Sequence, residues 1–171
     1  MRLISDMGSF ITKSKWTVLL FFIALTLPLF ILTFDTANWS DDYQLTNMIV
    51  LKARFSPVIP MCFELVSGLK ESDHFVPVYM LINYLLASVT TDPRFFHFVI
   101  LVVYVLTGFL LHLIVEEYHK DKTLAVATGA LYLINYYLNF KAIAWNCFHG
   151  HSTNVFLGAT SVYFLLRHLN G

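Results

Sequence analysis

Four long apolar runs, separated by polar stretches, dominate the pattern of hydrophobic and polar positions along this chain. They cover residues 16–34, 93–115, 123–139 and 151–167. Apolar runs of roughly 17 to 25 residues with few charges have the length that a helix needs to cross a membrane. The pattern therefore predicts an all-α protein, a polytopic membrane helix bundle of about four spans that forms a single membrane domain over residues 1–171.

The stretch between the first two runs, residues 35–90, is more polar and is broken by Pro57, Pro60 and Gly68. Short amphipathic segments within it are expected to lie along the membrane surface, as interfacial helices of an outer loop. Its last part, residues 74–89, is apolar but shorter than the usual span of about 20 residues. We favour a helix at the outer leaflet for this part. The alternative is a further span, which would reverse the side on which every later loop lies.

The composition agrees with a membrane protein and excludes some other classes. Hydrophobic residues make up 57% of the chain and charged residues 13%, whereas soluble domains are about half apolar and about a quarter charged. The formal net charge is zero, which argues against nucleic-acid binding. The two cysteines, Cys62 and Cys147, make neither a disulfide framework nor a zinc motif. No internal repeat suggests a transporter built from two matched halves.

Basic residues at the N-terminus predict the orientation. Three of them precede the first apolar run: Arg2, Lys13 and Lys15. The run is long for a signal peptide and no convincing cleavage site follows it, so we expect an uncleaved anchor. By the positive-inside rule the N-terminus is then cytoplasmic. We expect an integral, multi-pass protein of the bacterial inner membrane rather than of the endoplasmic reticulum.

A pair of adjacent carboxylates, Asp41 and Asp42, follows the first run and lies on the outer side in this topology. One carboxylate can accept a proton from an attacking hydroxyl while its environment keeps the other one charged. Both can instead bind a hard divalent cation beside a substrate phosphate. A third interpretation needs no chemistry: the pair caps an interfacial helix and interacts favourably with its dipole. All three stay open at the level of the sequence.

Several histidines are further candidates. His74 enters the apolar segment before the second run, where it can meet a phosphate or be an ordinary interfacial residue. His149 and His151 form an H-x-H pattern that can bind a metal, with a polar loop anchored by Trp145 as the alternative. Two more histidines lie within the second run: His97 and His112. Neutral histidines inside a membrane helix are expected to form hydrogen bonds between helices.

Four short phrases follow one another along the chain. They are Ser40-Asp-Asp-Tyr43, His74-Phe-Val-Pro77, Arg94-Phe-Phe-His97 and Ala144-Trp145. In this order they resemble the N-terminal portion of the integral-membrane glycosyltransferases of the C-type superfamily, a mannosyltransferase-like group that uses polyprenyl-phosphate sugars. The resemblance covers most of residues 16–168. It implies transfer of a sugar from a polyprenyl-phosphate donor to an acceptor hydroxyl on the extracytoplasmic side.

The resemblance also implies roles for single residues. Asp41 matches the catalytic acidic position, as a base or as a metal-linked carboxylate, and Asp42 supports it. His74 stands where the family usually has Arg or Lys, which weakens its contact with the donor phosphate. The other substrate-binding candidates line the outer cavity: Arg94, Lys141 and His149.

The partners that this resemblance implies are a lipid-linked sugar donor, membrane lipids and a membrane-protein partner, without nucleic acid. The one implied cofactor is a divalent cation, Mg²⁺ or Mn²⁺. Family enzymes usually have many more spans, so we expect this chain to be the N-terminal part of a longer architecture. The alternative is a non-catalytic small membrane subunit or scaffold, in which the acidic pair would tolerate alanine.

Overall fold

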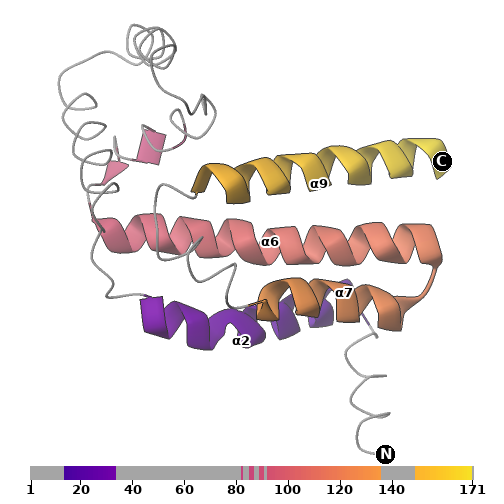
Figure 1. The fold of residues 1–171 in the computed structure, drawn as a ribbon, viewed down its shortest axis with the longest axis horizontal. Coiled ribbons are helices and arrows are strands. Elements are labelled where there is room, and N and C mark those ends of the chain that lie inside the picture. Colours follow the sequence, from indigo (N-terminus) through magenta and orange to yellow (C-terminus); the bar gives the residue numbers. More distant parts are fainter. Residues whose placement is uncertain are drawn as a thin grey trace, which may run out of the picture.

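The fold is a small bundle of helices (Figure 1). The computed structural model describes residues 14–33, 82, 85–86, 89–90, 92–135 and 149–170. Its main helices are α2 (Lys15–Thr33), α6 (Pro93–His119), α7 (Lys122–Ile134) and α9 (His149–Asn170). No strand occurs among the described residues. Each helix falls on one of the four predicted apolar runs, so the all-α prediction is confirmed.

One helix is long and apolar enough to cross a membrane, judged by length and composition over the described part of the chain. It is the segment Arg94–His119 of α6. The apolar segments Lys15–Ile31 in α2 and Lys122–Ile134 in α7 are shorter. The prediction of about four spans therefore stays a prediction, while the helical content that it requires is present.

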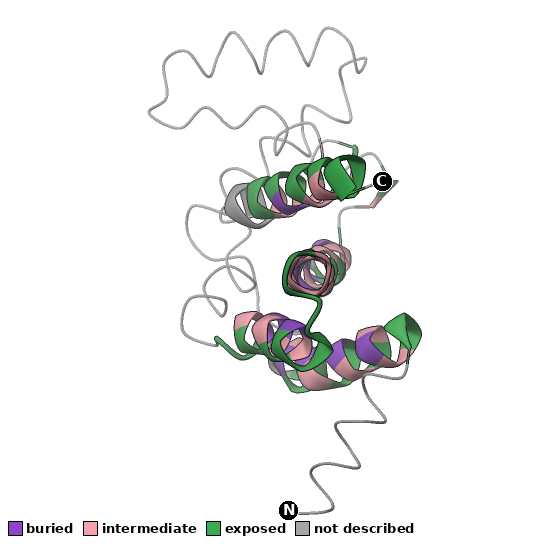
Figure 2. Ribbon diagram, turned by 90° about the vertical axis from the view of Figure 1, so that its right-hand side faces the viewer, coloured by how far each residue is buried: buried purple, intermediate pink, exposed green. Residues whose placement is uncertain are grey.

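Helix α6 lies in the middle of the bundle, with α9 on one side and the pair α2 and α7 on the other (Figures 1 and 2). Helices α2 and α7 run in one direction, and α6 and α9 run in the opposite direction. As a result α2 ends and α6 and α9 begin towards one end of the bundle, and the opposite termini of these helices lie towards the other. Helix α7 is shorter: it starts beside the end of α6 and ends part-way along it.

The tight turn between α6 and α7 explains why these two helices are antiparallel neighbours. Lys120 adopts the left-handed conformation at φ 57°, and its N–H donates to the carbonyl of Glu116. A left-handed residue of this kind commonly ends a helix. Asp121 then starts α7 by accepting hydrogen bonds from the backbone N–H groups of Thr123 at 2.9 Å and Leu124 at 3.1 Å. A carboxylate in this N-cap position satisfies donors that have no partner within the helix.

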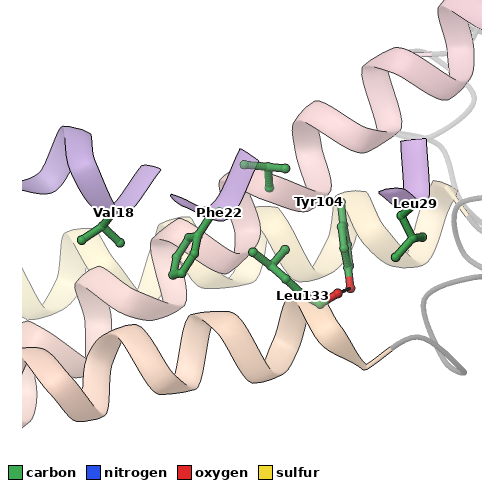
Figure 3. Close-up of a cluster of buried hydrophobic side chains, with 6 residues drawn as sticks. Val18, Phe22, Leu29, Tyr104 and Leu133 are labelled. Atoms are coloured by element: carbon green, nitrogen blue, oxygen red, sulfur yellow. Dashed lines mark hydrogen bonds between the residues drawn. The ribbon is translucent and has the colours of Figure 1, made fainter. Parts of the chain in front are cut away.

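The core lies where α2, α6 and α7 meet (Figure 3). Its buried apolar residues are Val18, Phe22, Leu29, Tyr104, Val105 and Leu133. The hydroxyl of Tyr104 donates to the carbonyls of Tyr132 at 2.9 Å and Leu133 at 3.1 Å. The last carbonyls of a helix have no partner within it. Tyr104 therefore satisfies two orphan acceptors at the end of α7 while its ring fills the core.

Tyr104→Phe is expected to destabilise the bundle by about 1–3 kcal/mol, because it leaves buried carbonyls without their donor. At roughly 2–4 °C per kcal/mol for a chain of this size, the melting temperature falls by about 2–12 °C. Thermal unfolding in detergent micelles, followed by circular dichroism, measures the shift. Tyr118→Phe is the matched control, since Tyr118 lies on the same helix and is 70% exposed. Equal shifts for both variants would mean that the hydrogen bond contributes nothing.

Two glycines allow a close approach of the helices in this core. A Cβ atom added to Gly129 of α7 would lie 2.5 Å from the ring of Phe22 and 2.7 Å from the carbonyl oxygen of Gly108. A Cβ atom on Gly108 would instead meet the side chain of Leu133, at 2.8 Å. Small residues at such crossings are characteristic of helix packing in membranes. Here they bring the backbones of α6 and α7 together beneath Phe22.

Large apolar side chains are exposed on the outer surface of the described helices, and a few polar side chains are buried between them. The buried polar or charged residues among those described are Thr26, His97, Thr107 and His112. The outer face of α2 is apolar and exposed: Trp16, Leu20, Ile23, Leu27 and Ile31. The outward faces of the helices are largely exposed, and the buried positions face the neighbouring helices (Figure 2). Large exposed apolar surfaces on a protein mark contact with a membrane or with another protein.

Candidate functional site

The candidate site is the end of the bundle at which α2 ends and α6 and α9 begin (Figure 1). Helix α7 runs towards this end and stops part-way along α6. Contacts between helices fix the arrangement close to this end. The rings of Phe30 in α2 and Phe98 in α6 pack edge to face with centroids 6.4 Å apart. Further along α6, Tyr104 binds the end of α7.

Arg94 is the predicted site residue that the structure describes most fully. It lies in the first turn of α6 with an exposed side chain. Its backbone N–H donates to the carboxylate of Asp92 at 2.9 Å, and the N–H of Asp92 donates to the hydroxyl of Thr90 at 3.2 Å. The Asp92 cap and Pro93 after it explain why α6 begins here. They give no reason for an arginine at position 94, because the helix dipole does not stabilise a cation in the first turn.

The other predicted site residues are described in part or not at all. His149 is the first residue of α9, at the same end as Arg94, and its side chain is not described. The remaining candidates lie outside the described residues: Asp41, Asp42, His74 and Lys141. The structure therefore brings the positions of Arg94 and His149 to one end of two helices that pack together.

The predicted cation site is not tested by the structure. Asp41, the predicted ligand, lies outside the described residues, and the side chains of His149 and His151 are not described. Within the described residues, no group of three or more His, Cys, Asp or Glu side chains could hold a metal ion. Binding of Mg²⁺ or Mn²⁺ stays a prediction.

The opposite end of the bundle is rich in basic residues. Those with exposed side chains are Lys15, His119, Lys120, Lys122, Arg167 and His168. The carboxylate of Glu117 at this end accepts hydrogen bonds from Lys120 at 3.0 Å and from Asn170 at 3.1 Å. Glu117 thereby ties the end of α9 to the turn after α6.

The two histidines inside α6 are both buried, His97 to 1% and His112 to 2% exposed. His112 Nε2 lies 3.6 Å from the Oε2 atom of Glu116, one turn further along the same helix. The sequence predicts hydrogen bonds between helices for these residues. The Glu116 contact of His112 lies within its own helix, while the backbone of Ala125 in α7 provides a hydrogen bond from the neighbouring helix. The Glu116 partner was missed at the sequence level, although residues four apart on a helix are always neighbours.

Comparison with known proteins identifies no relative, since no family model, no curated protein and no solved structure matches the chain. The fold itself defines the class. It is an all-α protein whose described part contains one helix with the length and composition of a membrane span. Function must therefore be argued from the residues and from the arrangement of the helices.

Proposed function

We propose that this chain is a multi-pass membrane glycosyltransferase, or the N-terminal portion of one, that uses a polyprenyl-phosphate sugar on the extracytoplasmic side. The observation that carries the proposal is the shared end of the bundle. The segment with Asp41 and Asp42 follows α2, the segment with Lys141 follows α7, and Arg94 and His149 begin α6 and α9. The end of α2 and the starts of α6 and α9 lie towards one end of the bundle, and α7 runs towards the same end and stops part-way along α6.

The exposed apolar surface and the buried polar side chains support the membrane part of the proposal. In lipid, helices associate through small residues and polar contacts, and apolar side chains face outwards. Buried Thr26, Thr107 and His112, together with the exposed apolar face of α2, follow that pattern. In α6, 33% of the most apolar window is buried. The core helix of a soluble protein would be mostly buried instead.

The charged residues support the orientation. Lysines and arginines collect at cytoplasmic helix ends, and the exposed basic residues Lys15, Lys120, Lys122 and Arg167 are at the end opposite the candidate site. The end of α2 and the start of α6 share the other side. That arrangement favours an outer loop over residues 35–90 without a net crossing, although residues 74–89 lie mostly outside the described residues.

The chemistry follows from the residue types. Asp41 would accept the proton of the acceptor hydroxyl while the hydroxyl oxygen forms its bond to the anomeric carbon of the sugar. The bond between that carbon and the phosphate oxygen breaks, and the polyprenyl phosphate leaves with its electron pair. Arg94 and Lys141 would bind the departing phosphate, with His74 and His149 beside them. A bound Mg²⁺ or Mn²⁺ would supply further charge neutralisation at the phosphate.

Cysteine labelling tests the orientation. With Cys62 and Cys147 replaced by serine, Asp92→Cys is expected to react with a membrane-impermeant maleimide in sealed right-side-out vesicles. Lys122→Cys is expected to react only after the vesicles are opened. Both positions are exposed, so reagent access through the aqueous phase alone decides the result. Reaction of Lys122→Cys in sealed vesicles would contradict the orientation and, with it, the outer position of Asp41.

A second candidate function, a non-catalytic membrane subunit, is favoured by one observation. Helix α9 packs on α6, and most of the rest of its surface is exposed and apolar. The large exposed side chains are Val155, Leu157, Val162, Phe164, Leu165 and Leu169. Such a face suits either lipid or a partner helix. Loss of a partner on purification, with no sugar transfer by wild-type membranes, would support this candidate over the enzyme.

A further inference from the structure

One ionisable group, His112, is buried at the junction of three helices and has no part in the proposed function. It projects from α6 and is 2% exposed. The ring of Phe22 from α2 packs edge to face against it at a centroid distance of 6.2 Å. Phe109, on the same helix, lies at 5.9 Å. The imidazole is therefore enclosed by aromatic rings in the core that joins α2, α6 and α7.

The two nitrogens of this ring have different surroundings. Nε2 lies 3.6 Å from Glu116 Oε2, and the side chain of Glu116 is 23% exposed. Nδ1 is buried and has no hydrogen-bond partner among the described residues. The neutral ring needs one acceptor for its single N–H group, and Glu116 stands next to Nε2. The protonated ring has two donors, and the backbone of Ala125 in α7 favours the second proton, but burial of the charge among aromatic rings remains costly.

Charged groups reach His112 from each helix at the junction. Burial opposes a positive charge on the ring most strongly, and Lys15 of α2 and Lys122 of α7 oppose it as well. Glu116 of α6 and the backbone of Ala125 in α7 favour a proton there. The side chain of Glu116 is partly exposed, so solvent screens its attraction for a charged ring. The side chain of His112 is buried, so solvent does not reduce the cost of placing a charge there. The balance favours the neutral ring whenever the three helices are packed together.

We propose that His112, with Glu116 as its partner, is a proton-binding site inside the bundle that loosens the packing of α7 against α2 and α6 when it is occupied. This inference is independent of the glycosyltransferase proposal, because it rests on residues away from the acidic pair. The imidazolium is better accommodated when the junction opens to water, since both N–H groups then find acceptors. Acidification through the range in which histidine titrates, near pH 6.5, is therefore expected to open the junction.

The test compares the melting temperature of the full chain in lipid nanodiscs at pH 7.5 and pH 5.0. Wild-type protein is expected to lose at least about 3 °C more than the His112→Gln variant between the two pH values. Glutamine is close in size and cannot take up the proton. His119→Gln is the matched control, because His119 is on the same helix and exposed. It is expected to retain the full acid sensitivity of wild type.

A second variant keeps the proposal testable if His112→Gln does not fold. Glu116→Gln removes the negative charge that stabilises the charged ring, so this variant is expected to be more sensitive to acid than wild type. The same acid-induced loss in wild type and His112→Gln would overturn the proposal, and so would stabilisation of wild type by acid. If His112→Gln cannot be measured, an unchanged acid sensitivity in Glu116→Gln would overturn it in the same way.

Discussion

Asp41→Asn is expected to reduce sugar transfer by about 100- to 10,000-fold, the usual contribution of a general base. The amide has nearly the shape of the carboxylate but cannot accept the proton of the acceptor hydroxyl. The measurement is transfer of a radiolabelled sugar from a polyprenyl-phosphate donor, in membranes that contain the complete native protein at matched abundance. Activity of the wild-type membranes is the reference for the comparison.

The choice of asparagine separates catalysis from capping. Asparagine caps a helix about as well as aspartate does, so the interpretation of Asp41 as an interfacial N-cap predicts no change in transfer. Asp121→Asn is the matched control, because Asp121 caps α7 at the opposite end of the bundle and its cap survives the change. Unchanged transfer by Asp41→Asn would remove this residue from the mechanism.

Chelation then separates the two chemical roles of Asp41. If the carboxylate acts through a bound Mg²⁺ or Mn²⁺, EDTA is expected to abolish transfer by the wild type, and added cation restores it. If Asp41 acts as a base alone, EDTA leaves the wild-type rate unchanged. The sequence leaves both roles open because a carboxylate beside a phosphate serves either purpose equally well.

The helices were predictable because their apolar runs are long. Proline at the start of the second run correctly marks the first turn of α6, where Asp92 caps the helix. The run alone predicts an end at residue 115, but α6 continues to His119 and ends at the left-handed Lys120. Charged residues in a last turn are compatible with a helix, so hydrophobicity gives no signal for its true end. The left-handed conformation of Lys120 sets the end of α6.

The packing and the site were less predictable, for a different reason. A glycine within an apolar run looks the same whether it faces lipid or another backbone, so Gly129 and Gly158 cannot be distinguished in the sequence. The structure separates them: a Cβ on Gly129 meets a backbone carbonyl, and a Cβ on Gly158 meets nothing within 4 Å. For the acidic pair, the position between two apolar runs is clear from the sequence. Its chemistry depends on surroundings that lie outside the described residues.

Gly129→Ala is expected to destabilise the bundle by about 3 kcal/mol, at the upper end of the usual range for overpacking. Phe22 can rotate away from the added methyl group, but the carbonyl oxygen of Gly108, 2.7 Å from the new Cβ, belongs to the backbone of α6. Relief therefore requires α6 and α7 to separate. The expected fall in melting temperature is about 6–12 °C, measured by thermal unfolding in the same nanodiscs.

Two matched glycines give this prediction its controls. Gly108→Ala is expected to be milder, because the new Cβ meets the side chain of Leu133, which can adjust. Gly158→Ala has free space around it in the middle of α9, so it is expected to stabilise by up to about 1 kcal/mol through helix propensity. The order Gly129, Gly108, Gly158, from most to least destabilising, follows from what each methyl group would touch. If all three alanines behaved alike, propensity alone would account for them, and α6 and α7 would not meet at these glycines.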